Sequence, residues 1–170
     1  MSAIVLLLAA MIFMVDAAFM MGKVEGKGAA VANAVVGILM SFYSIVLAMG
    51  AKDSGSLIVA GLAITFSVFY IVLAWNLFVG CEFKSLGWIC IAAGIYVGLC
   101  SYFFFGAGDL RFGAFAASWS VLFFAAAGNM LLGKNWGMPI GILMAVQSVV
   151  TCACLSHDVR PLVELTLARK

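Results

Sequence analysis

The chain has 170 residues, of which 66% are hydrophobic and only 9% are charged. A soluble domain typically has about 25% charged residues, and the mean hydropathy of this chain is +1.24, so the composition excludes an ordinary globular domain and a disordered chain. The net charge of +2 comes from scattered residues that form no basic patch, which excludes a nucleic-acid-binding protein. The remaining class is a membrane protein that crosses the bilayer several times.

Six apolar runs follow one another, and each is long enough to span a bilayer as a helix, which takes about 20 apolar residues. The runs are continuous rather than alternating, which favours helices over the strands of a β-barrel. The predicted spans are residues 2–22, 29–50, 57–79, 85–105, 112–132 and 138–156, separated by glycines and charged residues. We therefore predict an all-α membrane protein with one six-helix domain, residues 1–156, and a short polar tail, residues 157–170.

The short turns between the spans differ in charge. The turns after the first, third and fifth spans contain Lys23, Lys27, Lys84 and Lys134, whereas the other two contain only Lys52 and Arg111. Because short cytoplasmic loops carry an excess of Lys and Arg, we expect the first set inside and both termini outside the cell membrane. Arg160, Arg169 and Lys170 of the tail would then also lie outside, which weakens the contrast.

A glycine recurs where each odd-numbered span ends, at Gly22, Gly80 and Gly133. This recurrence predicts three helical hairpins of one design around a central pore. The alternative is that any short cytoplasmic turn favours glycine and lysine without a repeat.

Few charged or amide side chains occur within the predicted spans: Asp16, Asn33, Asn76, Asn129 and Gln147. Such groups are costly in a bilayer and usually face the bundle interior or a water path. At about 1.5 Å per residue, the first four lie within about 9 Å of the cytoplasmic ends of four different helices. They would form a polar vestibule if their faces converge. Alternatively, each one caps a neighbouring helix or ties two helices together.

Aromatic residues form two pairs at helical spacing. Phe66 and Tyr70 share one face of the third span, and Trp119 and Phe123 share one face of the fifth. The pairs lie at matching depths, which predicts two aromatic layers, and Gln147 lies near the midplane at the lower level. This arrangement suits a small, flat, neutral, polar solute. The alternatives are plain aromatic packing and, for Gln147, a tie between two helices.

The sequence contains no pattern typical of a metal or catalytic site. The five cysteines, Cys81, Cys90, Cys100, Cys152 and Cys154, fit no metal motif, and four of them lie in apolar runs where free cysteine behaves as a small hydrophobe. No predicted span carries His, Lys or Arg, and neither a P-loop nor an HExxH motif occurs. We therefore expect no enzyme, no cofactor and no bound metal.

From the first span to the sixth, the sequence resembles the AmiS/UreI family of bacterial urea and short-chain amide channels. The residues that carry the resemblance are Gly22-Lys23-Val24, Lys27, Ala30-Val31-Ala32-Asn33, Val36-Gly37, Phe66, Tyr70, Ala74, Asn76, Trp88 and Trp119-Ser120-Val121-Leu122. The resemblance implies six helices, both termini outside, a separate pore in each protomer and assembly into hexameric rings. By position, it implies a pore constriction formed by Phe66, Tyr70, Trp119, Leu122, Phe123 and Gln147.

The sequence also departs from the acid-gated urea channel of that family. Phe123 replaces a second pore tryptophan, Gln147 replaces a glutamate, and Asp16 stands where that channel has an asparagine. The outer loops are short and contain no histidine, which is the side chain that titrates near neutral pH. We therefore predict a passive channel for urea or small aliphatic amides without an acid gate.

Two other functions remain open at the level of sequence. Asp16 could serve a proton- or cation-coupled carrier of small solutes, which would accumulate its substrate. The chain could also be a structural or sensory membrane subunit without transport.

Overall fold

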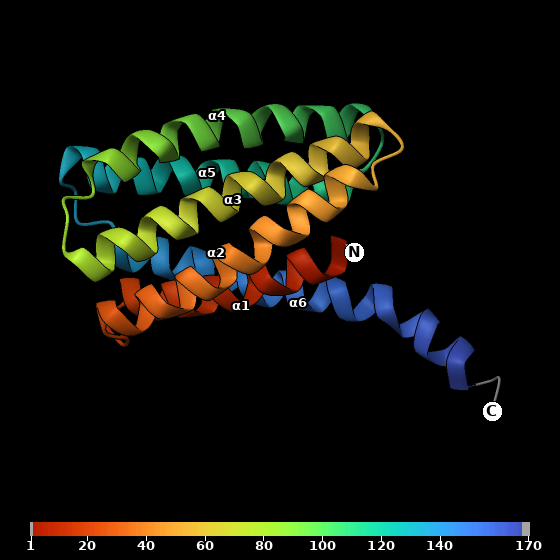
Figure 1. Ribbon diagram of the computed structural model, residues 1–170, viewed down its shortest axis with the longest axis horizontal. Helices are drawn as coiled ribbons and strands as arrows, with labels where there is room; N and C mark the ends of the chain where they lie inside the picture. The colour runs from red at the N-terminus through yellow and green to blue at the C-terminus, as the bar shows by residue number, and fades with distance from the viewer. Residues whose placement is uncertain (1, 168–170) are drawn as a thin grey trace.

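The computed structural model describes the backbone of residues 2–167 and the side chains of residues 3–155. In this part of the chain six α-helices follow one another: α1 (Ser2–Met20), α2 (Gly26–Met49), α3 (Ser54–Val79), α4 (Lys84–Gly106), α5 (Leu110–Leu132) and α6 (Gly137–Leu167). They form one elongated bundle in which neighbouring helices run in opposite directions (Figure 1).

Each helix contains a segment long and apolar enough to cross a membrane, so the protein is a multi-pass membrane protein. In α6 that segment covers Gly137–Leu155. The helix continues through the predicted polar tail to Leu167 and projects beyond the bundle (Figure 1). The side chain of His157 and residues 168–170 lie outside the described residues.

The recurring glycines share one backbone conformation. Gly22, Gly80 and Gly133 have φ angles of 71°, 76° and 62°, in the left-handed region that glycine adopts without steric cost. Each follows the last turn of α1, α3 or α5, where a left-handed residue lets the chain leave the helix. These three turns lie together at one end of the bundle, while α1 begins and α6 ends toward the other (Figure 1).

The helices pack most extensively in three pairs: α2 with α3, α4 with α5, and α1 with α6. In each pair a serine hydroxyl donates to a carbonyl oxygen of the facing helix: Ser67 to Gly37 at 2.9 Å, Ser120 to Gly94 at 2.8 Å and Ser148 to Ala10 at 2.7 Å. The pairing of α1 with α6 closes the bundle. These pairs connect one predicted hairpin to the next, and the threefold hairpin repeat stays a prediction.

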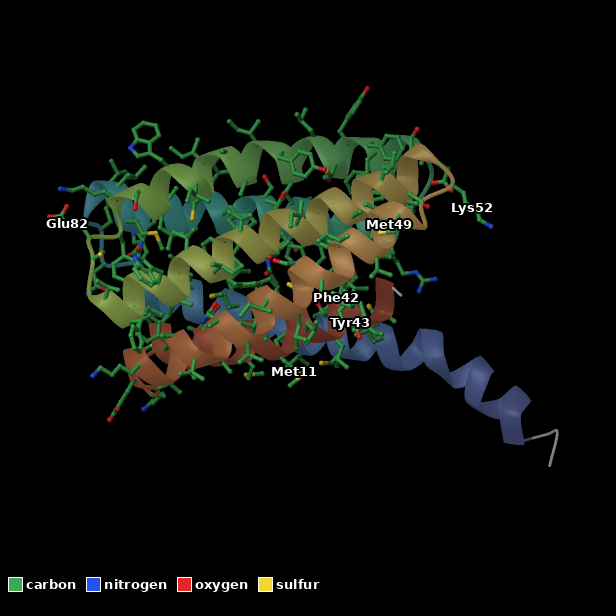
Figure 2. All side chains as sticks on the ribbon, in the orientation of Figure 1. Met11, Phe42, Tyr43, Met49, Lys52 and Glu82 are labelled. Carbon is green, nitrogen blue, oxygen red and sulfur yellow. The ribbon has the colours of Figure 1, made fainter. Side chains whose placement is uncertain are left out.

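The outer surface between the two ends is apolar. Met11, Phe42 and Met49 are all exposed, as a surface in contact with lipid requires. Glu82 and Lys52 mark the opposite ends, with Met11 and Phe42 on the flank between them (Figure 2). The buried core contains aromatic residues from four helices: Phe13 of α1, Phe66, Phe69 and Tyr70 of α3, Phe104 of α4, and Trp119 and Phe123 of α5.

Candidate functional site

A cavity of about 490 Å³ enters the bundle from the end that carries the glycine turns. Its lining begins at the exposed Glu82 and Lys84, in and after the α3–α4 turn. It continues between α1, α3, α5 and α6, and its deepest residue on α3 is Phe66. Phe66 is thirteen residues from the end of α3, so the cavity reaches about 20 Å into the bundle.

Aromatic rings close the deep end of this cavity. The ring of Phe66 lies 5.2 Å from that of Trp119, edge to face, and 5.2 Å from that of Phe123. Phe13 adds a fourth ring, 6.1 Å from Phe66. Beyond these rings lies a second hollow of about 30 Å³, which Phe66 and Trp119 also line. The rings therefore separate two hollow regions, and we call Phe13, Phe66, Trp119 and Phe123 the aromatic barrier.

The residues predicted for the constriction occupy different places around this barrier. Phe66, Leu122 and Phe123 line the large cavity, and Trp119 lines the small one. Tyr70 is fully buried, and its ring lies 6.0 Å from that of Phe66, but it lines neither hollow. The predicted aromatic layers meet edge to face or at a tilt rather than stacking.

Gln147 also lies outside the lining of both hollows. Its Nε2 donates to the carbonyl oxygen of Ser118 at 3.1 Å, which ties α6 to α5. Its Oε1 is buried and has no hydrogen-bond partner in the described part of the chain. One end of the amide therefore acts as a helix tie, while the other end stays available.

The four residues predicted for a polar vestibule are brought together only in part. Asp16 and Asn129 line the large cavity, whereas Asn33 and Asn76 do not. Asn33 instead donates to Asp16, and the Asn129 side-chain oxygen accepts from the Trp136 backbone N–H at 2.9 Å. Asn129 thus accepts a hydrogen bond from the α5–α6 turn and also lines the cavity, and the polar vestibule stays a prediction.

Asp16 and Asn33 form a buried pair between α1 and α2. Asn33 Nδ2 donates to Asp16 Oδ1 at 2.6 Å and to the carbonyl oxygen of Ala29 at 3.0 Å. Asp16 is 2% exposed and Asn33 is fully buried. The other oxygen of each side chain, Asp16 Oδ2 and Asn33 Oδ1, has no partner among the described residues.

Buried polar atoms without a partner gather on the predicted site residues. In the described part of the chain they are Asp16 Oδ2, Asn33 Oδ1, Tyr70 Oη, Asn76 Nδ2, Trp119 Nε1, Gln147 Oε1 and Thr151 Oγ1. Native proteins pair nearly all buried polar groups. All of these residues except Thr151 were predicted from the sequence as pore or vestibule residues, but only Asp16 and Trp119 among them line one of the two hollows.

Three residues of this region, Phe13, Phe69 and Thr151, were not predicted from the sequence. Phe13 lies three residues before Asp16 on the same face of α1. The position of Asp16 could therefore have been used to predict that Phe13 faces the same region. The ring of Phe69 lies 5.4 Å from that of Tyr70 and 5.3 Å from that of Phe123. Nothing in the sequence distinguishes it from the other phenylalanines, of which the chain has 14 in all. Thr151 lies one turn after Gln147 on α6 and carried no signal of its own.

Among the described residues, no group of three or more His, Cys, Asp or Glu side chains is placed to hold a metal ion.

Comparison with known proteins gives a family and a fold. The AmiS/UreI family transporter model matches residues 1–155. A comparison with curated protein sequences finds no match. The cryo-EM structure of the Helicobacter pylori urea channel in the closed state aligns with a TM-score of 0.80 at 20% identity, over 89% of this chain and 92% of that chain. A crystal structure of the urea channel from the same organism aligns at 0.78 and 19% identity, over the same shares.

Proposed function

This chain belongs to the AmiS/UreI family of transporters, and from that premise we propose that it is a passive channel for urea and small aliphatic amides. As a member of that family it is a membrane transport protein and not an enzyme. The proposed pore follows the large cavity, crosses the aromatic barrier and leaves through the small hollow.

The observation that carries this proposal is the combination of a deep cavity, a barrier of aromatic rings and unused polar atoms beside it. The cavity ends at Phe66, which also lines the hollow beyond together with Trp119. Buried polar atoms without a partner among the described residues lie on Trp119, which belongs to the barrier, and on Asp16, which lines the cavity. A flat solute with amide groups can exchange water for these atoms while its faces pass the rings.

The same geometry explains why ions would be excluded. At the barrier the ring of Phe66 packs against the rings of Trp119 and Phe123, with centroids 5.2 Å apart, and against Phe13 at 6.1 Å. A narrow apolar constriction cannot replace the hydration shell of an ion. A neutral amide loses far less hydration free energy than an ion does. It would therefore cross the barrier once small side-chain movements part the rings.

We propose that the channel has no acid gate. The two turns at the end opposite the cavity mouth, at residues 50–53 and 107–109, contain no histidine. Their acidic residues cap helices: Asp53 accepts from the Ser56 N–H and Asp109 from the Phe112 N–H, at 2.7 Å and 3.1 Å. Turns this short have no spare residues to form a histidine-bearing lid.

Assembly and orientation belong to the same proposal. The exposed apolar side chains on every flank would face lipid or neighbouring protomers, and we propose hexameric rings in which each protomer keeps its own pore. We place the cavity mouth, with Lys84 beside it, on the cytoplasmic side of the inner membrane because lysines concentrate in the turns at that end.

The experiment that tests the function is stopped-flow light scattering on proteoliposomes under inward gradients of urea or acetamide, at neutral and mildly acidic pH. We expect fast entry above empty liposomes, with similar rates at both pH values and no accumulation. Absence of flux would reject the channel. Flux confined to acidic pH would show a gate, and the ratio of the two rates would rank the solutes.

One observation favours a second function, a proton- or cation-coupled carrier. Asp16 is a buried carboxylate that lines the cavity, as a coupling site would require. A carrier would concentrate acetamide inside vesicles under an imposed proton or sodium gradient, and Asp16→Asn would abolish this accumulation. A passive channel only equilibrates the solute, whichever gradient is imposed.

A further inference from the structure

We propose that the large cavity contains a binding site for planar groups with several N–H donors, namely primary amides, urea and amidinium or guanidinium cations. Its binding residue is Asp16, and Asn33 is a positioning residue. The proposal rests on the proposed function in one respect: the site lies in the inner half of the pore that we assign to urea and amides.

The carboxylate of Asp16 supplies an acceptor that the protein itself does not use. Asp16 lines the cavity although it is only 2% exposed. Oδ1 is held at 2.6 Å by Asn33 Nδ2, and Oδ2 has no partner among the described residues. An unpaired acceptor of this kind leaves a large desolvation penalty that a donor from a ligand would remove.

Asn33 fixes the direction of this acceptor. Its Nδ2 is shared between Asp16 and the backbone carbonyl of Ala29 on its own helix, at 3.0 Å. The amide is fully buried and does not line the cavity, so it acts through Asp16. The pair thus presents acceptor oxygens and no free donor, because both contacts of Asn33 Nδ2 are internal.

The chemical class of the ligand follows from that one-sided pattern. The ligand must donate N–H groups to the carboxylate. Two N–H groups on one edge of a planar ligand suit a carboxylate best. Urea and primary amides satisfy this requirement as neutral molecules. Guanidinium has the same planar shape as urea, presents only N–H groups and adds a positive charge, so it should bind this site more tightly than urea.

The charges around the cavity favour a cation rather than oppose it. Of the residues that line it, Lys84 is the only base, and it lies at the mouth beside Glu82 with an N–O distance of 3.1 Å. Farther in, the described lining contains the carboxylate of Asp16 and no base. A guanidinium ion can therefore move from the mouth to Asp16 without meeting an unpaired positive charge.

The barrier makes the site accessible to ions from one side only. The route from Glu82 to Asp16 runs within the large cavity. The route from the opposite end is closed by the contact between Phe66 and Trp119. Neutral urea would cross this barrier, whereas guanidinium would not, so guanidinium would occupy the site and obstruct urea only when added on the mouth side.

The test measures urea flux in proteoliposomes of known protein orientation, with millimolar guanidinium on either side. We expect inhibition from the mouth side in the wild type, and a half-inhibitory concentration about tenfold higher in Asp16→Asn, as loss of a charge-assisted hydrogen bond implies. Tetramethylammonium, which has the charge but no N–H, should not inhibit. Equal inhibition of both proteins, equal inhibition by both cations or equal inhibition from both sides would overturn the proposal.

A matched variant separates the site from the fold. The exchange Asp16→Asn with Asn33→Asp keeps a carboxylate–carboxamide pair between α1 and α2 but moves the carboxylate out of the cavity lining. We expect this exchange variant to match the wild type in thermal stability. Like Asp16→Asn, it should be insensitive to guanidinium. Recovery of full sensitivity in the exchange variant would place the site elsewhere.

Binding is also measured without transport, as the shift in unfolding temperature of the detergent-solubilised protein with millimolar guanidinium. We expect a positive shift for the wild type and none for Asp16→Asn. If urea does not permeate but this difference is observed, the proposed function fails and the site stands. If urea permeates and the difference is absent, the site fails and the channel stands.

Discussion

Trp119 holds the aromatic barrier together from the side of α5. Its ring meets Phe66 edge to face at 5.2 Å and stacks on Phe115 at 5.7 Å with an interplanar angle of 18°. Its Nε1 is buried without a partner in the described part of the chain. In the proposed pore the side chain would therefore contribute both an apolar wall and a hydrogen-bond donor for a carbonyl oxygen of the solute.

Replacing Trp119 by Ala should widen the passage and weaken its selectivity. We expect glycerol, which is excluded by a narrow aromatic slot, to permeate severalfold faster, while the urea-to-glycerol rate ratio falls. Truncation of a packed aromatic side chain costs on the order of 3–5 kcal/mol of stability, so unfolding temperature and oligomer size are measured in parallel. Trp119→Phe, which keeps a ring, is the control. Unchanged solute selectivity in Trp119→Ala would remove this residue from the constriction.

At this scale the sequence was most informative where polarity is costly. An amide or carboxylate in an apolar span has few uses, which is why Asp16, Asn33 and Gln147 could be selected without a structure. Phe13 could not be selected in the same way, since one phenylalanine among fourteen has no distinguishing cost in a membrane. Which of the polar residues faces the cavity depends on helix rotation, and the sequence does not determine that.

At the scale of the helices, close approach depends on small residues at the contacts. A methyl group added at Gly37 would lie 2.8 Å from Ile71 Cγ1 and 3.2 Å from the Ile71 backbone nitrogen. The backbone of α3 cannot move aside as a flexible side chain can. The nearby bond from the Ser67 hydroxyl to the Gly37 carbonyl, at 2.9 Å, fixes the two helices at this separation.

Gly37→Leu should therefore force α2 away from α3. Overpacking typically costs about 1–3 kcal/mol, which we expect to see as a lower unfolding temperature in detergent and as reduced urea flux. Val35→Leu is the matched control, because Val35 lies on the exposed face of the same helix and a larger apolar side chain there meets lipid. Equal unfolding temperatures for the two variants would contradict the close contact.

The start of α3 provides a test of stability against pH. Asp53 accepts from the backbone N–H and the hydroxyl of Ser56, at 2.7 Å and 3.0 Å, and these hydrogen bonds lower the pKa of its carboxyl group. Because the pKa is lower in the folded than in the unfolded protein, the carboxylate stabilises the fold above the unfolded value of about 4. This stabilisation is lost as the pH falls through the folded pKa.

Asp53→Ala should accordingly lower the unfolding temperature at pH 7, and the gap from the wild type should close in acid below about pH 4. Asp53→Ser, which keeps a capping oxygen without a titratable group, should retain most of the stability and lose this pH dependence. A gap of the same size at pH 3 and pH 7 would show that the carboxylate charge does not act as a cap.

Helix positions were the most predictable feature of this chain, and helix partners the least. Apolar length and the glycines after α1, α3 and α5 predicted each span to within a few residues. The strongest pairing, of α2 with α3, depends on Gly37 facing Ile71, and Gly37 is one of 18 glycines in the sequence. The helical course of the predicted tail up to Leu167 was missed because polar residues after an apolar run end a membrane span without ending a helix.

For the whole molecule, the two ends of the bundle differ chemically. The end with the cavity mouth carries Lys23, Lys27, Lys84 and Lys134, and the other end carries Lys52 in a turn and Arg111 at the start of α5. Figure 2 shows Glu82 and Lys52 at these opposite ends. If the lysine-rich end faces the cytoplasm, as the distribution of positive charge favours, then solute leaving the cell enters the large cavity and meets Asp16 before the aromatic barrier.

A native cysteine reports this orientation. Cys81 is exposed in the α3–α4 turn next to Glu82, whereas Cys90 and Cys100 are buried, and Cys152 and Cys154 lie within the apolar segment of α6. A charged, membrane-impermeant maleimide should therefore label the protein in inside-out vesicles and not in right-side-out ones, and Cys81→Ser should remove the label. Labelling only in right-side-out vesicles would show that the protein has the opposite orientation in the membrane. The large cavity and Asp16 would then be the first features met by solute entering the cell, because the cavity mouth and Cys81 share one end of the bundle.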